Sequence, residues 1–94
     1  MKKLKIGGNI YTVKTVNSGE IENDCGECAT NKLLIRIADD VVEAAYAPTL
    51  LHEIIHAINI SLDEKETEFM TQAIYQVLVD NPEFTKLFLK RRTL

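Results

Sequence analysis

The sequence lacks the features that mark nucleic-acid-binding, secreted and membrane proteins. Its 11 Lys and Arg residues are outnumbered by 14 Asp and Glu residues, and the formal net charge of −3 leaves no basic excess to neutralise phosphates. Gly7-Gly8-Asn9 follows Met1-Lys2-Lys3 closely, so the apolar run of a signal peptide is missing. No apolar stretch approaches the length of a transmembrane helix. We therefore expect a cytoplasmic protein without nucleic-acid or membrane partners.

Cysteine and histidine are also scarce, with two of each. The cysteines form one CxxC pair, Cys25 and Cys28, and a structural zinc site with four ligands would need a second such pair. A redox CxxC pair is expected at the start of a helix, where the helix dipole lowers the thiol pKa, whereas the residues here indicate a turn followed by a strand. We expect the placement of the two cysteines to be incidental, and a metal or redox role is the less favoured alternative.

Both histidines belong to one motif, His52-Glu53-Ile54-Ile55-His56. On an α-helix, residues four apart share a face, so the two imidazoles can bind one metal ion together. Glu53 can then lean over the open position of the metal and accept a proton from water, as in the HExxH pattern of zinc hydrolases. The surrounding stretch is apolar nearly all round, which predicts a buried helix in which histidines need a partner. Two core histidines on an ordinary helix are the alternative.

The length and the residue pattern predict one α+β domain. Ninety-four residues suffice for a single modest core, so we expect one domain spanning residues 1–94. Residues 1–37 are expected to be mainly β, as a small antiparallel or mixed sheet of two to four strands, and residues 39–94 mainly α. Within the first part, residues 3–16 predict either a hairpin or one strand preceded by a turn. Residues 33–37 predict the clearest strand, with every second residue from the first onward on its buried face.

Proline and capping residues divide the second part into helices. Pro48 predicts a break between a short first helix and the helix that carries the motif. Ser61 and Glu64 match a capping box at the start of the next helix. Asn81 and Pro82 predict the start of a last helix, as its cap and first residue. The apolar residues expected to bury these last two helices are Met70, Ala73, Ile74, Val77 and Leu78 on one, and Phe84, Leu87, Phe88 and Leu94 on the other.

The third metal ligand should be a carboxylate, because a catalytic zinc site takes three protein ligands and the chain has no third histidine. Glu64 already has a role in the expected capping box. Glu66 lies one turn before the expected apolar stripe, where a carboxylate is costly unless it has a partner such as a metal. Glu68 lies on a more polar face of the same helix. We therefore favour Glu66 as the third ligand, with Glu68 as the alternative carboxylate. A cysteine is a poor second choice to a carboxylate.

With these residues placed, the chain resembles small zincin-type proteins of phages and mobile elements, related in pattern to the ImmA/IrrE and SprT-like metallopeptidases. The resemblance rests on residues 50–58, the acidic helix start that follows and residues 75–82, and it spans roughly residues 27–84. It implies a minimal zincin-like domain that hydrolyses peptide bonds in a protein or peptide substrate. In ImmA/IrrE-like proteins the third ligand is a glutamate early in the helix after the motif, which matches Glu66 best. Those peptidases normally carry further substrate-binding elements.

The sequence therefore predicts a zinc metallopeptidase in which His52, His56 and Glu66 hold Zn²⁺ and Glu53 is the general base. Two tyrosines, at positions 46 and 75, are candidates by residue type for an oxyanion donor, although packing roles are favoured for both. One alternative is a zinc-stabilised, catalytically latent binding module from a phage or mobile element. Another is a metal-free helical interaction domain.

Overall fold

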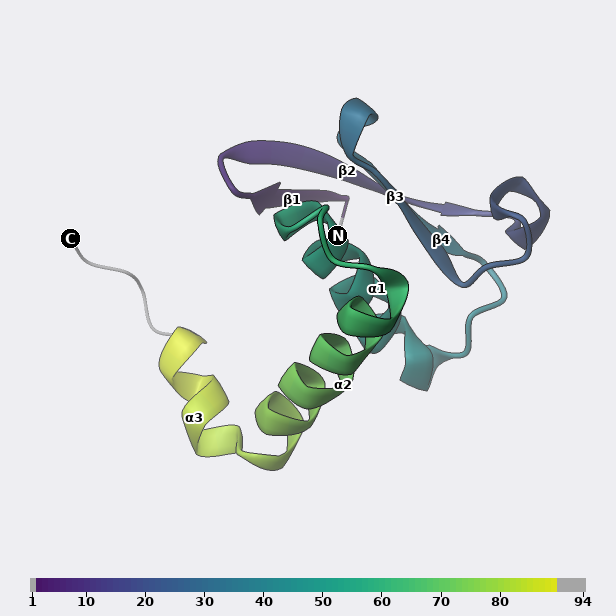
Figure 1. The fold of residues 1–94 in the computed structure, drawn as a ribbon. Coiled ribbons are helices and arrows are strands. Elements are labelled where there is room, and N and C mark those ends of the chain that lie inside the picture. The colour runs from purple at the N-terminus through teal and green to yellow at the C-terminus, as the bar shows by residue number, and fades with distance from the viewer. Residues whose placement is uncertain (1, 90–94) are drawn as a thin grey trace.

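The computed structural model describes residues 2–89 and shows a four-stranded sheet followed by helices (Figure 1). This confirms the predicted α+β class and its order, with the strands in the first part of the chain. Leu94, which was expected to dock the last helix, lies outside the described residues. The strands are β1 (Lys3–Ile6), β2 (Asn9–Val16), β3 (Gly26–Ala29) and β4 (Leu34–Ala38), and the helices are α1 (Glu43–Ile58), α2 (Glu64–Asp80) and α3 (Pro82–Lys86). Short 3-10 turns cover Ser18–Ile21, Thr30–Lys32 and Leu87–Leu89.

The sheet is mixed, with strand order β1-β2-β4-β3. β1 and β2 form the predicted antiparallel hairpin, whose turn places Gly7 and Gly8 at φ +56° and +87°, a backbone region that favours glycine. β2 pairs with β4 in parallel, and β3 pairs with β4 antiparallel, so β3 forms one edge of the sheet. This edge strand borders the site described below.

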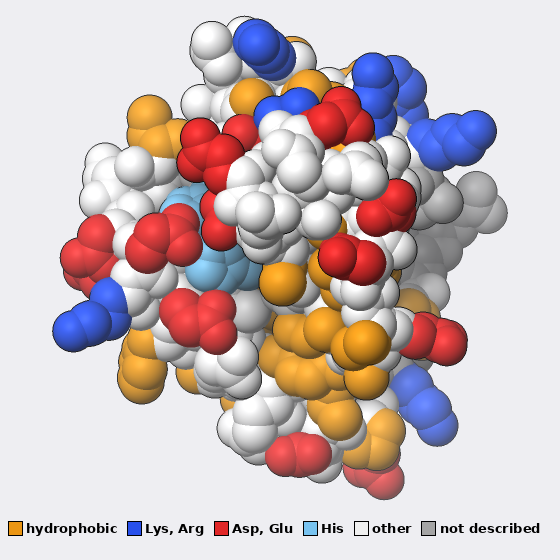
Figure 2. Space-filling view, turned by 90° about the vertical axis from the view of Figure 1, so that its right-hand side faces the viewer, with side chains coloured by type: hydrophobic (Ala, Val, Ile, Leu, Met, Phe, Trp, Pro, Cys, Tyr) orange, Lys and Arg blue, Asp and Glu red, His pale blue; other side chains and the backbone are white. Residues whose placement is uncertain are grey.

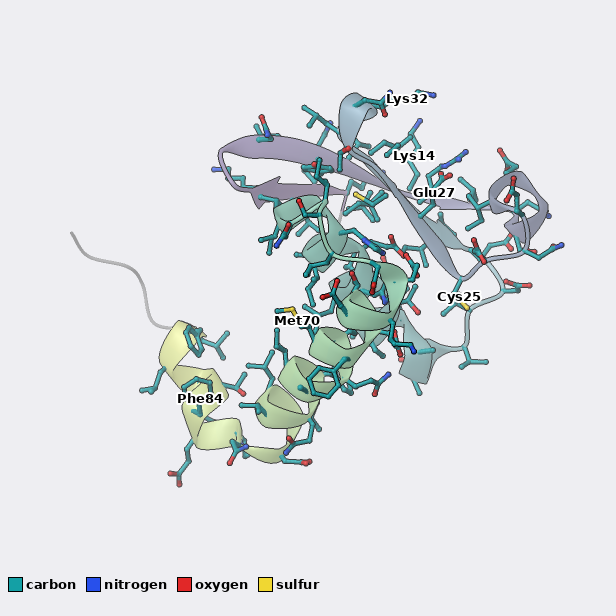
Figure 3. All side chains as sticks on the ribbon, viewed as in Figure 1. Lys14, Cys25, Glu27, Lys32, Met70 and Phe84 are labelled. Carbon is teal, nitrogen blue, oxygen red and sulfur yellow. The ribbon has the colours of Figure 1, made fainter. Side chains whose placement is uncertain are left out.

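The core lies between α1 and one face of the sheet. Ile35 and Ile37 on β4 are fully buried, and Leu50 on α1 packs in the same cluster. The opposite face of the sheet carries charged side chains, and Lys14 and Glu27 point away from the helices (Figure 3). One detail of the predicted strand is wrong: Leu33 precedes β4 in a left-handed conformation at φ +51° and is partly exposed, because it ends the 3-10 turn before the strand.

The predicted break at Pro48 does not occur, and α1 runs continuously through it. Proline lacks the N–H that would bond to the carbonyl four residues earlier, which belongs to Ala44. Ala44 is exposed, so water can hydrate that carbonyl and limit the cost. The remaining residues keep the helix intact up to Ile58, and the HExxH motif therefore lies in the last two turns of one long helix.

The capping box of α2 is also shifted by two residues from the predicted one. Asp63 is the cap: its side chain accepts from the Glu66 N–H at 2.7 Å, and the Glu66 carboxylate accepts from the Asp63 N–H at 3.0 Å. The predicted pair, Ser61 and Glu64, does not form this arrangement. As a result, Glu64 becomes the first residue of the helix and its carboxylate is free for another role.

The buried face of α2 differs from the predicted apolar stripe. Its only buried residues are Thr67 and Thr71, which are almost completely enclosed, whereas Met70, Ile74 and Val77 are each more than a third exposed. The physical reason is the orientation set by α1. Residues 64, 67, 68 and 71 share one helical face, and this polar face is turned toward the histidines. The apolar stripe consequently faces outward.

The last helix begins where predicted, with Pro82 as its first residue after Asn81. It does not dock as expected, since Phe84, Leu87 and Phe88 are largely exposed. Within the described residues, no helix combines the length and the apolarity needed to cross a membrane.

Candidate metal centre

The last two turns of α1 place both histidine rings on the floor of a cleft. The ring centroids of His52 and His56 lie 4.8 Å apart with an interplanar angle of 71°. Their side chains are 14% and 20% exposed, so each ring is held by its surroundings yet reachable from the cleft. Figure 2 shows the two pale blue side chains surrounded by red carboxylates. The spacing of four residues thus has the geometric effect that the sequence predicts.

Glu64, at the start of α2, completes a cluster with the two histidines. One of its carboxylate oxygens lies 2.5 Å from His56 Nε2 and the other lies 3.3 Å from His52 Nε2. One ligand atom from each of the three residues lies within 4.8 Å of the others, and the residues that the structure describes contain no other group of this kind. Two imidazole nitrogens and a carboxylate oxygen could hold a metal ion, and this donor set is of a type found in catalytic metal sites.

Glu66, the predicted third ligand, is not part of this cluster, and Glu64 occupies the place beside the histidines that the sequence assigned to Glu66. Its carboxylate bonds to the backbone N–H of Asp63 as the second half of the capping box. Residues 64 and 66 are separated by about 200° around a helix axis, so both cannot face the histidines. Because the helix starts two residues later than predicted, Glu66 takes the capping position expected for Glu64, and Glu64 takes the position beside the histidines expected for Glu66.

Glu68, the predicted alternative ligand, contacts the other side of one histidine. Its carboxylate lies 2.9 Å from His52 Nδ1, and Gln72 donates to its second oxygen at 2.8 Å. The bond from Gln72, together with that from His52, lowers the pKa of the Glu68 carboxyl. With Nδ1 donating to Glu68, Nε2 of His52 keeps its lone pair for a metal. In the metal-free structure Glu68 therefore holds the ring of His52 and lies outside the cluster of His52, His56 and Glu64.

Glu53 lies in the same cleft but is almost enclosed, with 5% of its area exposed. β3 crosses directly over it: a Cβ atom added at Gly26 would lie 3.1 Å from Glu53 Oε2 and 3.0 Å from Thr49 Cγ2. Glycine is the residue that permits this close approach. Burial raises the pKa of the Glu53 carboxyl from its ordinary 4.5 to about 7; His52 opposes the rise, and neighbouring carboxylates, Glu64 foremost, add to it.

The cleft itself has a volume of about 700 Å³. β3 and the loop before it form one wall, α1 forms the floor and the first half of α2 forms the other wall. Cys25 and Cys28 also line it, and both are free thiols outside the cluster. Burial raises the pKa of the Cys28 thiol to about 11, which disfavours the thiolate that a metal would bind. Tyr46 packs against the core, in keeping with its expected packing role.

The metal-free protein is expected to lose stability as the pH rises from about 5 to about 8. The folded protein favours the protonated form of a carboxyl whose folded pKa lies above its unfolded value. The stability that protonated Glu53 contributes is therefore fully present below pH 4.5 and is lost as the pH rises through about 7. A shift of that size corresponds to roughly 3 kcal/mol. Glu53→Gln should restore this amount near pH 8 and change little near pH 5, as measured by urea unfolding with a chelator present.

A matched control for that measurement is Glu43→Gln, which alters an exposed glutamate on the same helix. Its unfolding free energy should follow that of the unmodified protein across the pH range. If Glu53→Gln and Glu43→Gln gave parallel pH profiles, burial of an unpaired Glu53 carboxylate would be excluded.

The resemblance to ImmA/IrrE-like and SprT-like metallopeptidases rests on the sequence motifs alone and stays a prediction. Comparison of this chain with family models, with curated proteins and with solved structures finds no match.

Proposed function

We propose that this protein is a zinc-dependent hydrolase of peptide bonds. One observation carries the proposal: a cluster of two imidazoles and a carboxylate shares a cleft with a separate, nearly enclosed carboxylate, Glu53. The cluster alone would suit any divalent cation that accepts nitrogen ligands. A second carboxylate beside it, directly after the first histidine in sequence, is the arrangement that hydrolysis requires.

The donor set fits a catalytic zinc ion. His52 and His56 would bind through Nε2 and Glu64 through its carboxylate, which makes three protein ligands. Structural zinc sites are normally closed by four protein ligands, and neither cysteine joins this cluster. When bound, zinc supplies a Lewis acid that lowers the pKa of water and polarises a carbonyl group.

Glu53 is the proposed general base. It accepts the proton of the attacking water and passes it to the leaving amine. None of the hydrogen bonds and ion pairs that the described residues form in the cleft includes the Glu53 carboxylate, so its oxygens are available. Its pKa of about 7 in the metal-free protein is close to the pH at which a base and an acid role are both accessible. Glu68 supports the reaction indirectly by holding the ring of His52.

The wall of the cleft formed by β3 suits an extended peptide. β3 is an edge strand, and residues 26–28 line the cleft. An edge strand offers unpaired backbone groups to which an extended chain can add, and such pairing binds a peptide without requiring particular side chains. The exposed Ile60 lies at the same cleft and would contact the apolar part of a substrate.

Hydrolysis by this protein is expected to depend on zinc. Protein purified without a histidine tag should contain one zinc ion per chain and should cleave members of a diverse fluorogenic peptide library. Chelation should abolish cleavage, and added zinc should restore it. One zinc ion per chain without any cleavage would favour the latent binding module, whereas protein without zinc would favour the metal-free interaction domain.

A further inference from the structure

The outward side of α2 and α3 carries a continuous apolar surface. Figure 3 shows Met70 on α2 and Phe84 on α3, both on the side of the molecule where the two helices meet. A groove of about 390 Å³ runs between the two helices, and all of its lining residues are apolar. We call this surface the α2–α3 face, and it comprises Met70, Ala73, Ile74, Val77, Phe84 and Phe88.

These helices are not stabilised by burial within one chain. From residue 72 to residue 89 no side chain is buried, and Phe88 is 66% exposed. α3 has only five residues. Helices this short are marginal in water and owe their stability to packing of an apolar face. The α2–α3 face therefore requires a covering surface, which the described part of the chain does not supply.

The solvent-accessible surface area of the chain indicates how large the covering surface is. A folded monomer of 10.6 kDa is expected to expose about 5,500 Å², whereas this chain exposes 7,103 Å². Even if the six residues outside the described range contributed as much area as an unfolded chain, an excess of about 800 Å² would remain. An excess of this size is close to the area of about 800 Å² that each partner buries in a protein–protein interface of standard size, and the exposed α2–α3 face contributes to it together with the open histidine cleft.

The distribution of charge favours a second copy of the chain as the partner. Residues 69–79 contain no charged side chain, although the chain has a net charge of −3. In a two-fold dimer the same surface is contributed twice, so like charges would meet if the surface carried any. An uncharged face avoids that repulsion. The carboxylates of Glu64 and Glu68 lie on the opposite, inward side of α2, so the cleft would stay open.

We propose that two copies of this chain form a dimer by packing their α2–α3 faces against each other about a two-fold axis. This dimer is independent of the proposed hydrolase activity, because its surface and the metal centre lie on different sides of α2. In solution, sedimentation equilibrium of the full chain should give twice the mass of 10.6 kDa.

Charge substitutions test the surface directly. Val77→Glu and Phe88→Glu each place two like charges in the interface, and each should raise the dimer dissociation constant at least about 100-fold. Ile10→Glu is the matched control, because Ile10 is a 56% exposed apolar residue on β2, and this variant should stay dimeric. Circular dichroism checks that the variants are folded, and if Val77→Glu is unfolded, Phe88→Glu decides.

Two results would overturn the dimer. One is a wild-type chain that sediments as a monomer up to about 100 μM, which would assign the α2–α3 face to a different protein partner. The other is a wild-type dimer that persists in both the Val77→Glu and the Phe88→Glu variants, which would place the interface elsewhere on the chain.

Discussion

Glu53→Gln is expected to abolish peptide hydrolysis while the bound zinc remains in place. Glutamine keeps the size of the side chain and removes the proton acceptor, and general-base catalysis typically contributes 10²–10⁴-fold. We therefore expect kcat/KM to fall about 10³-fold. His52, His56 and Glu64 are untouched, so zinc stoichiometry measured by mass spectrometry should stay at one per chain.

The control for this prediction is again Glu43→Gln, on the exposed first turn of α1. It should retain full activity and full zinc content. A fully active Glu53→Gln variant would contradict the role of Glu53 as base. Loss of zinc from Glu53→Gln would instead mean that Glu53 is a ligand, which its enclosed position under β3 argues against.

Glu64→Ala should weaken zinc binding, whereas Glu66→Ala should lower stability and leave zinc binding unchanged. Removing a residue that only orients a ligand typically costs 10–100-fold in metal affinity, so removing the ligand Glu64 should cost more than about 100-fold. Glu66→Ala should leave zinc affinity unchanged. It should lower the unfolding free energy of the metal-free protein by about 1 kcal/mol, because it breaks the capping box of α2.

Competition with a chromophoric chelator measures the zinc affinity of both variants, and urea unfolding measures their stability. The two residues have the same side chain and lie in the same helical turn, so each variant serves as the control for the other. If Glu66→Ala lost zinc and Glu64→Ala kept it, the register of α2 described above would be wrong.

Local sequence patterns were sufficient to predict the structure where the geometry depends on a single helix or hairpin. The spacing of His52 and His56 brings two rings together on any regular helix, and Glu53 follows from the same motif. The hairpin of β1 and β2 is encoded by its own turn residues. Each of these features depends on neighbours within a few positions, so tertiary contacts had little opportunity to change them.

The position of Glu64 beside the histidines could not be predicted because two capping boxes compete in the sequence. Ser61 with Glu64 and Asp63 with Glu66 have the same spacing, and serine and aspartate are comparable caps. The choice between them rotates every later residue of the helix into a different role. In the structure Glu64 contacts both histidine rings, an interaction between two helices that a local pattern does not encode.

The orientation of α2 is a second feature that the local sequence pattern does not predict. The usual assumption places an apolar stripe toward the core, and that assumption assigned Met70 and Val77 to the interior. The inward face instead carries Thr67, Thr71 and the carboxylates near the histidines. A helix that turns its polar side inward to build a site leaves its apolar side exposed, which is why the metal centre and the α2–α3 face occur on one helix.

The central claim is that His52, His56 and Glu64 together bind one zinc ion. Anomalous diffraction at the zinc edge from zinc-loaded crystals tests it most directly. We predict a single strong peak coordinated by Nε2 of both histidines and by the Glu64 carboxylate, with a water molecule in the remaining position. A peak coordinated by Glu66 or by a cysteine, or the absence of any peak between the two histidines, would contradict it.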